Sequence, residues 1–71
     1  MTGNICTIVA DKGYFFIKGE DGHQYFAHKS DLMVAQWIYD LQLDDLVGFE
    51  PTRPEKGPRA VSIVLNRLAL G

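Results

Sequence analysis

The stretch DKGYFFIKGEDGHQYFAHKS, residues 11–30, contains five of the eight aromatic residues of this 71-residue chain. Aromatic side chains are common in β-strands, and closely spaced glycines favour turns because glycine readily adopts positive φ. The stretch therefore predicts two strands, 13–18 and 24–28, joined by a turn at 19–22. Side chains alternate between the two faces of a strand. Each strand thus carries rings on both faces, whereas only one face can line the core of a small barrel.

The alternation sorts the side chains of these two strands into two sets. One face carries Phe15, Ile17, Tyr25 and Ala27, and the other carries Tyr14, Phe16, Phe26 and His28. If the first set forms the core, the second is an exposed aromatic surface, and an exposed apolar cluster usually marks a binding site. Flat rings stack on nucleobases, so the surface points to single-stranded nucleic acid. The alternative, in which residues 31–43 cover the outward rings, stays open.

The remaining segments predict three more strands. Residues 3–10, 46–50 and 59–65 are rich in apolar and β-branched side chains, which is typical of strands. The segment 51–58 holds all three prolines and is expected to be a loop. Five short strands predict an all-β, five-stranded Greek-key barrel of the oligonucleotide-binding (OB) fold, and an SH3-like barrel is the competing topology.

A longer connection separates the third and fourth predicted strands. Residues 31–43 contain no Gly or Pro, and Ser30 or Asp31 can cap a helix, so a short helical or irregular segment is expected there. The length of the chain predicts a single domain, 1–71, in which 65–71 is a tail or the start of a linker.

Composition argues against several classes of protein. Cys6 is the single cysteine, so no internal disulfide can form, and a reducing, cytoplasmic location is expected. Two histidines and one cysteine do not supply the four ligands of a structural zinc, so no metal and no other cofactor are expected. No nucleophile is paired with a base, so the chain is not expected to be an enzyme. No apolar run reaches the roughly 20 residues that span a membrane.

The formal net charge of −2 argues mildly against a nucleic-acid partner, but the distribution of charge matters more. Basic residues flank the two aromatic strands and lie in or next to the proline-rich loop, whereas acidic residues gather elsewhere. The sequence predicts that four of these cations contact phosphates, namely Lys12, Lys29, Lys56 and Arg59.

Several motifs in this order resemble the bacterial cold-shock domain family. Lys12–Ile17 resembles the family's Lys-Gly-Phe-Gly-Phe-Ile motif, and Tyr25–Ser30 resembles its Val-Phe-Val-His-Phe-Ser motif. Val47–Glu50 is similar to the Val-x-Phe-Glu strand, and Lys56–Ala60 is similar to the Lys-Gly-Pro-x-Ala segment. The resemblance implies an OB barrel that holds single-stranded RNA or DNA on its second and third strands, often as an RNA chaperone. Tyr14, Phe16, Phe26 and His28 would then be the stacking groups.

The chain departs from this family at several positions. Cys6 and Thr7 stand where the family carries Lys and Trp, which removes a phosphate contact and a stacking ring, so Cys6 is expected to be accessible to solvent. Phe15 replaces a glycine and Ala27 a valine, which suggests altered core packing. A monomer is expected. The rival hypothesis is a divergent barrel that binds protein, or forms a dimer, through Met33–Tyr39.

Overall fold

The computed structural model describes residues 1–32, 41–55 and 57–65. Its strands are β1 (Thr2–Val9), β2 (Tyr14–Gly19), β3 (Gln24–His28), β4 (Leu46–Thr52) and β5 (Arg59–Leu65). Single 3-10 turns, η1 (Ala10–Lys12) and η2 (Lys29–Asp31), follow β1 and β3. In the described part of the chain, no helix is long and apolar enough to cross a membrane.

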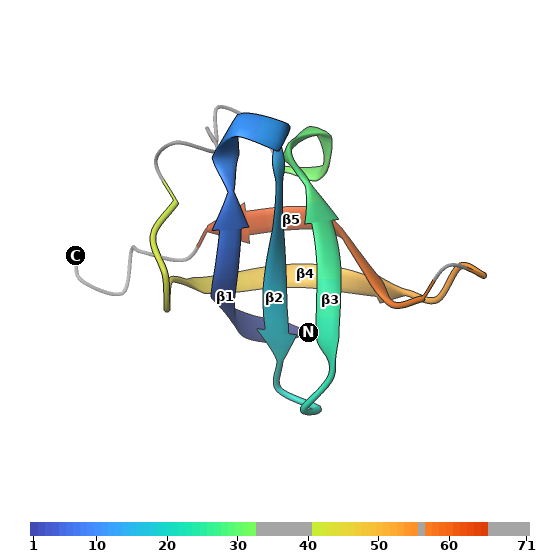
Figure 1. The fold of residues 1–71 in the computed structure, drawn as a ribbon. Coiled ribbons are helices and arrows are strands. Elements are labelled where there is room, and N and C mark those ends of the chain that lie inside the picture. Colours follow the sequence, from blue (N-terminus) through green and yellow to red (C-terminus); the bar gives the residue numbers. More distant parts are fainter. Residues whose placement is uncertain (33–40, 56, 66–71) are drawn as a thin grey trace.

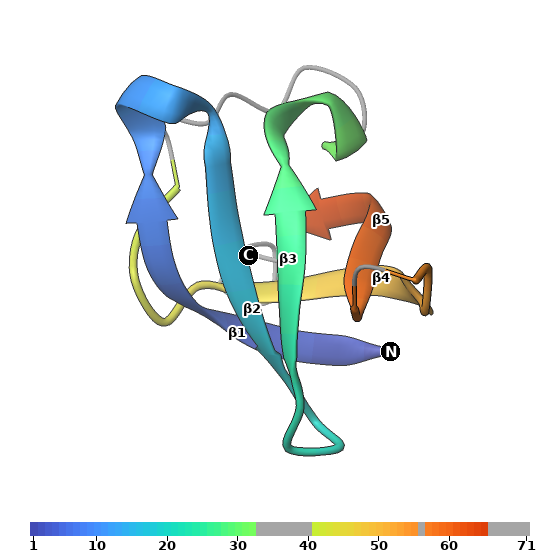
Figure 2. The same ribbon diagram turned by 45° about the vertical axis from the view of Figure 1, so that its right-hand side comes forward.

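The strands form a closed barrel in the order β1-β2-β3-β5-β4. β1, β2 and β3 are an antiparallel meander, and β4 pairs antiparallel with both β1 and β5. β3 pairs with β5 in the parallel direction. Figure 1 shows the meander on one side of the barrel, with β4 and β5 crossing behind it, and Figure 2 shows β5 beside β3. The predicted five-stranded OB barrel is therefore confirmed.

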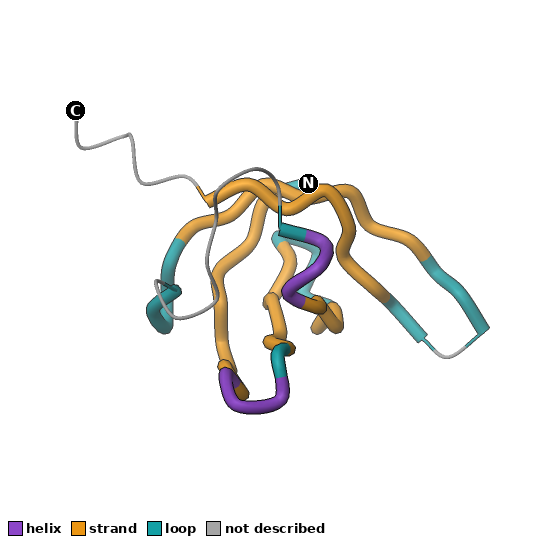
Figure 3. Tube along the Cα trace, turned by 90° about the horizontal axis from the view of Figure 1, so that it is seen from above, coloured by secondary structure: helices purple, strands orange, loops and turns teal. Residues whose placement is uncertain are grey.

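The observed strands agree closely with the predicted ones, and the largest difference lies at the end of β4. This strand continues through Pro51 to Thr52, two residues beyond the predicted end. Proline is tolerated there because pairing with β1 ends at Gly48, so on that side Pro51 needs no N–H. The loop between β4 and β5 then projects away from the barrel, as Figures 1 and 3 show.

The connection after β3 begins with a helical turn, but earlier than predicted. The turn is η2, and it is capped by His28, whose Nδ1 accepts a hydrogen bond from the Ser30 N–H at 3.1 Å. Leu32 is already extended and forms a parallel bridge with Ile63 of β5. Residues 33–40, which include most of the predicted helical segment and the proposed protein-binding stretch, lie outside the described residues.

The core is built from residues of all five strands. Phe15, Ile17, Tyr25 and Ala27 are at most 1% exposed, so the predicted inward face of β2 and β3 is confirmed. The other buried apolar residues are Ile5, Leu41, Val47, Phe49, Ala60 and Ile63. Full burial of one large apolar side chain stabilises a fold by about 1.5–3 kcal/mol. The inward face of the meander is thus committed to the core, and its opposite face is left for other roles.

Candidate nucleic-acid interface

One row of side chains crosses four strands on the outer face of the barrel. Thr7 of β1 pairs with Phe16 of β2, Phe16 pairs with Phe26 of β3, and Phe26 pairs with Arg59 of β5. Directly opposed residues lie on the same face of a sheet. The row therefore places two rings beside each other, with a hydroxyl at one end and a guanidinium at the other.

Tyr14 joins these two rings to form a cluster, hereafter the aromatic face (Tyr14, Phe16 and Phe26). The ring centroids are 5.9 Å apart for Tyr14 and Phe16, 5.5 Å for Tyr14 and Phe26, and 5.7 Å for Phe16 and Phe26. Each of the three side chains is half-buried, whereas Phe15 between Tyr14 and Phe16 is fully buried. Phe16 meets both Tyr14 and Phe26 edge to face, an arrangement that aromatic pairs prefer, and none of the three rings belongs to the core.

His28 extends the aromatic face at the end of β3, where it pairs with Tyr14. Its Nδ1 accepts from the Ser30 N–H and lies 2.8 Å from the Ser30 hydroxyl oxygen. Because Nδ1 is an acceptor, the neutral ring carries its proton on Nε2. The half-buried imidazole is thus held in one orientation beside the Tyr14 ring, with an N–H donor on its other edge.

Two of the predicted phosphate-binding lysines lie at this same end of the barrel. Lys12 is in η1 and Lys29 is in η2, and both are exposed. The Lys29 N–H donates to the Gly13 carbonyl at 2.9 Å, which ties the two turns together. Lys12 and Lys29 therefore form a basic edge next to Tyr14 and His28. Lys56 lies outside the described residues.

Arg59 is placed differently from the lysines. Its Nη2 donates to Asp31 Oδ2 at 2.9 Å, and its Cζ lies 5.9 Å from the centroid of the Phe26 ring. The sequence predicts for Asp31 only the role of a helix cap. No local pattern indicates this ion pair, because the two residues are 28 positions apart and meet only through the pairing of β3 with β5.

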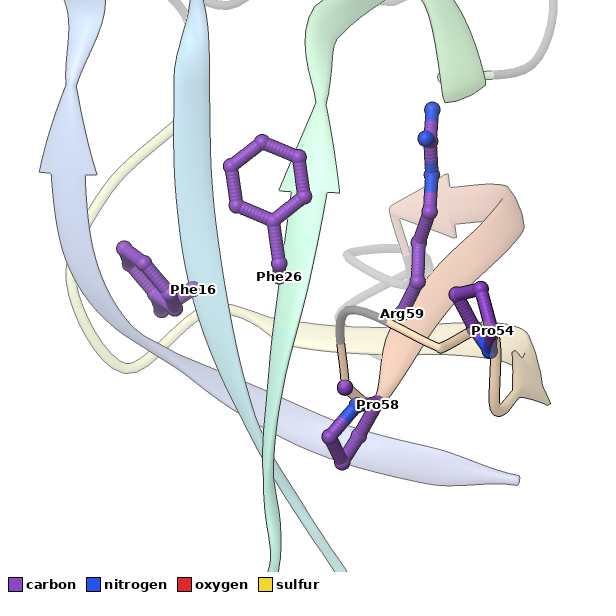
Figure 4. A pocket seen from close by; sticks show the side chains of 6 residues that line it. Phe16, Phe26, Pro54, Pro58 and Arg59 are labelled. Atoms are coloured by element: carbon purple, nitrogen blue, oxygen red, sulfur yellow. The ribbon is translucent and has the colours of Figure 1, made fainter.

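A pocket of about 550 Å³ opens beside the aromatic face. Its lining residues are Phe16, Phe26, Pro54, Gly57, Pro58 and Arg59. Figure 4 shows the Phe26 ring across the gap between β2 and β3, with Arg59 rising along the far side of β3 and the two prolines near its base. The loop after β4 thus supplies a wall that the sequence does not indicate, because the prolines by themselves predict only a loop.

The positions where the family carries Lys and Trp are both open to solvent. The pairing of β1 with β2 shifts between Ile5 and Thr7, so Cys6 is an extra residue in the strand. Cys6 and Thr7 are exposed, which confirms the predicted accessibility of Cys6. The Cys6 thiol lies 3.6 Å from the Phe16 carbonyl oxygen, as a weak donor. The bulge therefore turns two consecutive side chains outward beside Phe16.

A second polar contact lies at the other end of the meander, in the turn between β2 and β3. The Tyr25 hydroxyl donates to Asp21 Oδ2 at 2.6 Å, and the His23 N–H donates to Asp21 Oδ1 at 3.0 Å. These hydrogen bonds hold the pKa of Asp21 below its ordinary value, and the bond from Tyr25 has the largest effect. The same contact raises the pKa of Tyr25. The contact ties the hydroxyl of a core tyrosine to the turn and takes no part in the aromatic face.

Comparison with known proteins places this arrangement in a family. Residues 1–66 match the model of the 'Cold-shock' DNA-binding domain. The chain is 36% identical over 62 residues to Cold shock protein 1 of Lactiplantibacillus plantarum, which covers 87% of this chain and 92% of that protein. The closed barrel and the outward aromatic cluster agree with both findings. The chain belongs to the cold-shock domain family, a family of nucleic-acid-binding and not catalytic domains.

Proposed function

We propose that this protein binds single-stranded RNA or DNA through the aromatic face together with His28. The observation that carries the proposal is the cluster of Tyr14, Phe16 and Phe26, half-buried and outside the core, on the strands where the family binds nucleic acid. A base stacked on an aromatic ring contributes about 1–3 kcal/mol, and every base has such a face. Binding should therefore tolerate most sequences.

Phosphate contacts come from the basic edge formed by Lys12 and Lys29, with Lys56 as a third cation. Lysine attracts phosphate as a compact point charge and releases the counterions of the strand. Lys12 and Lys29 are exposed and have no ion pair within the described part of the chain, so their charges are available. Arg59 was also predicted to meet phosphate, but Asp31 already offsets its charge.

Weak, sequence-tolerant binding suits an RNA chaperone, which must hold unpaired strands without trapping them. The exposed thiol of Cys6 fits a reducing compartment such as the cytoplasm. The rival hypothesis, protein binding through Met33–Tyr39, concerns residues outside the described part of the chain and gains no support here.

A fluorescence titration with labelled oligothymidine tests the proposal. Phe16→Ala and Phe26→Ala should each weaken binding by about 1–3 kcal/mol, because each removes one stacking face. Phe16→Leu and Phe26→Leu are the matched controls, since leucine keeps apolar bulk beside Tyr14 and lacks only the ring. Thermal unfolding of every variant shows whether the barrel is intact.

Chaperone activity needs its own measurement. An RNA hairpin with a fluorophore and a quencher at its ends should open further as the protein is added, and the Phe16→Leu/Phe26→Leu double variant should open it less. Unchanged oligothymidine affinity in the folded double alanine variant would show that the aromatic face is not the binding surface.

A further inference from the structure

Building on the proposed nucleic-acid binding, we propose that Arg59, positioned by Asp31, reads the edge of the base that stacks on Phe26. The consequence is a preference for guanine at one position of the bound strand. The proposal concerns a specificity-determining residue, Arg59, and a positioning residue, Asp31, within a surface that otherwise tolerates any base.

The backbone of Arg59 is held rigidly beside Phe26. The two residues are partners in the parallel pairing of β3 with β5, and the Phe26 N–H donates to the Pro58 carbonyl at 3.1 Å. On its other side, the Arg59 carbonyl accepts from the Thr52 hydroxyl at 3.1 Å. A group that reads a base must be fixed relative to the surface on which the base stacks, and these hydrogen bonds provide that anchor.

The side chain of Arg59 is also restrained. The hydrogen bond from Nη2 to Asp31 holds the guanidinium over the Phe26 ring, with Cζ 5.9 Å from the ring centroid. The Asp31 side chain is only 17% exposed, whereas that of Arg59 is 41% exposed. The carboxylate is therefore largely covered and acts as an anchor, while part of the guanidinium remains open to a ligand.

The charge of the pair favours a base edge over a phosphate. With Asp31 at 2.9 Å, the local charge is balanced, so a phosphate that approached Arg59 would also meet a carboxylate. A neutral base edge suffers no such repulsion and needs only hydrogen-bond donors. Within the described part of the chain, Lys12 and Lys29 form no ion pair with a carboxylate. This basic edge therefore suits phosphate better.

The donors that remain on Arg59 match guanine among the purines. Arginine has five N–H donors in a planar fork; one N–H of Nη2 is taken by Asp31, and Nε is covered by the protein without a partner. The outer N–H groups of Nη1 and Nη2 can serve two adjacent acceptors. Guanine offers O6 and N7 side by side, whereas adenine offers N7 beside an N–H₂ donor. In a single strand this edge is accessible.

The pocket beside the aromatic face has room for such a base. Phe26 and Arg59 both line it, and Pro54 and Pro58 line it near the base of Arg59, as seen in Figure 4. A base that lies on Phe26 would present one edge to Arg59. The volume of about 550 Å³ falls in the range of small-ligand sites.

The test compares two purines at the same place in the strand, which cancels the stronger stacking of purines over thymine. Labelled oligothymidines of about eight nucleotides carry one guanine or one adenine at each position in turn. At one position, wild-type protein should bind the guanine strand at least about fivefold tighter than the adenine strand, the lower limit for a bidentate contact. Replacing that guanine by 7-deazaguanine, which lacks N7, should remove most of the preference. Hypoxanthine, which keeps O6 and N7, should retain it.

Two variants connect the preference to the residues. Arg59→Met keeps much of the length of the side chain without its N–H donors, so it should bring the guanine-to-adenine ratio near one. Asp31→Asn removes the carboxylate at nearly constant size and should lower the ratio by freeing the guanidinium. Melting curves establish that both variants are folded, and the 7-deazaguanine comparison needs no variant at all.

The outcomes separate this inference from the function on which it rests. Wild-type binding of all strands with equal affinity for guanine and adenine at every position overturns the inference and leaves the proposed function standing. Tighter binding of both strands by Asp31→Asn, with a steeper salt dependence and an unchanged ratio, also overturns it, because Asp31 would then only mask a phosphate contact. Failure to bind any strand overturns the proposed function itself.

Discussion

Phe15 of β2 and Ala27 of β3 are direct cross-strand partners, and both are fully buried. A large side chain therefore faces a small one at a single level of the core. The cold-shock motifs that this chain resembles have glycine and valine at these two positions, so the two departures from the family lie opposite each other. A gain of volume on one strand is matched by a loss on the next, as expected for a core that tolerates volume-conserving changes.

This pairing predicts how the core responds to substitution. Ala27→Val should lower the free energy of unfolding by about 1–3 kcal/mol, because the added methyl groups have no space beside Phe15. In a Phe15→Leu background the same change should cost at least about 0.5 kcal/mol less, since contacting residues couple by that much or more. Urea unfolding of the four proteins measures the coupling. Strictly additive effects would mean that the two side chains do not share the same space.

Gly3 is predicted to be irreplaceable for steric reasons. A Cβ at this position of β1 would lie 2.5 Å from the Lys18 carbonyl oxygen and 2.7 Å from Ile17 Cγ2. Because the carbonyl is backbone within the paired β2, Gly3→Ala should destabilise the barrel by about 1–3 kcal/mol. Gly48→Ala is the matched control, since nothing lies within 4 Å of a Cβ there, and it should be neutral or slightly stabilising. Equal midpoints of urea unfolding for the two variants would contradict this explanation.

The contact between Asp21 and Tyr25 predicts a dependence of stability on pH. The pKa of Asp21 is lowered in the folded state, so its contribution is complete above the ordinary value of about 3.8 and is lost as pH falls through the folded-state pKa. The stability difference between wild type and Asp21→Asn should thus be constant near neutral pH and shrink in acid. In a Tyr25→Phe background, which lacks the main hydrogen bond to Asp21, the effect of Asp21→Asn on stability should be smaller at every pH. Thermal melts across the acid range measure these differences in stability. A difference between wild type and Asp21→Asn that grows as the pH falls would contradict the lowered pKa of Asp21.

The exposed pair on β1 predicts a gain of affinity. Thr7 is the cross-strand partner of Phe16, and both Thr7 and Cys6 face solvent, so Cys6→Lys/Thr7→Trp should extend the aromatic face without disturbing the core. One more stacked base should tighten oligothymidine binding by roughly fivefold to a hundredfold. Thr7→Trp alone should show the quenching of a new tryptophan, and Cys6→Lys alone should only steepen the salt dependence. A folded double variant with unchanged affinity would place the ligand away from β1.

Salt dependence tests the proposed phosphate contacts. If about three phosphates are neutralised, log affinity should fall against log salt with a slope near −2, at roughly −0.7 per contact on a single strand. Lys12→Gln should make the slope shallower by about 0.7, whereas Lys12→Arg should preserve it. Titrations at several salt concentrations give the slopes. The same slope for both variants would mean that Lys12 contacts no phosphate.

Local features of the sequence determined most of the fold. The alternation of side chains over residues 13–18 and 24–28 was sufficient to place Phe15 and Ala27 on one face and Phe16 and Phe26 on the other, and burial shows that the first face is the core. This succeeded because the period of two is a property of each strand alone, and because closely spaced glycines mark a turn wherever they occur. The predicted five-stranded OB barrel agreed as well, since the rules of strand connection leave few topologies for five short strands.

Only the tertiary structure decided which distant residues meet. The ion pair of Arg59 with Asp31, 28 positions away, exists because β3 and β5 pair in parallel and η2 turns back over them. The bulge at Cys6 and the passage of β4 through Pro51 likewise depend on where neighbouring strands begin and end their pairing. Register between segments is set by the packing of the whole core, and no propensity or periodicity within one segment encodes it.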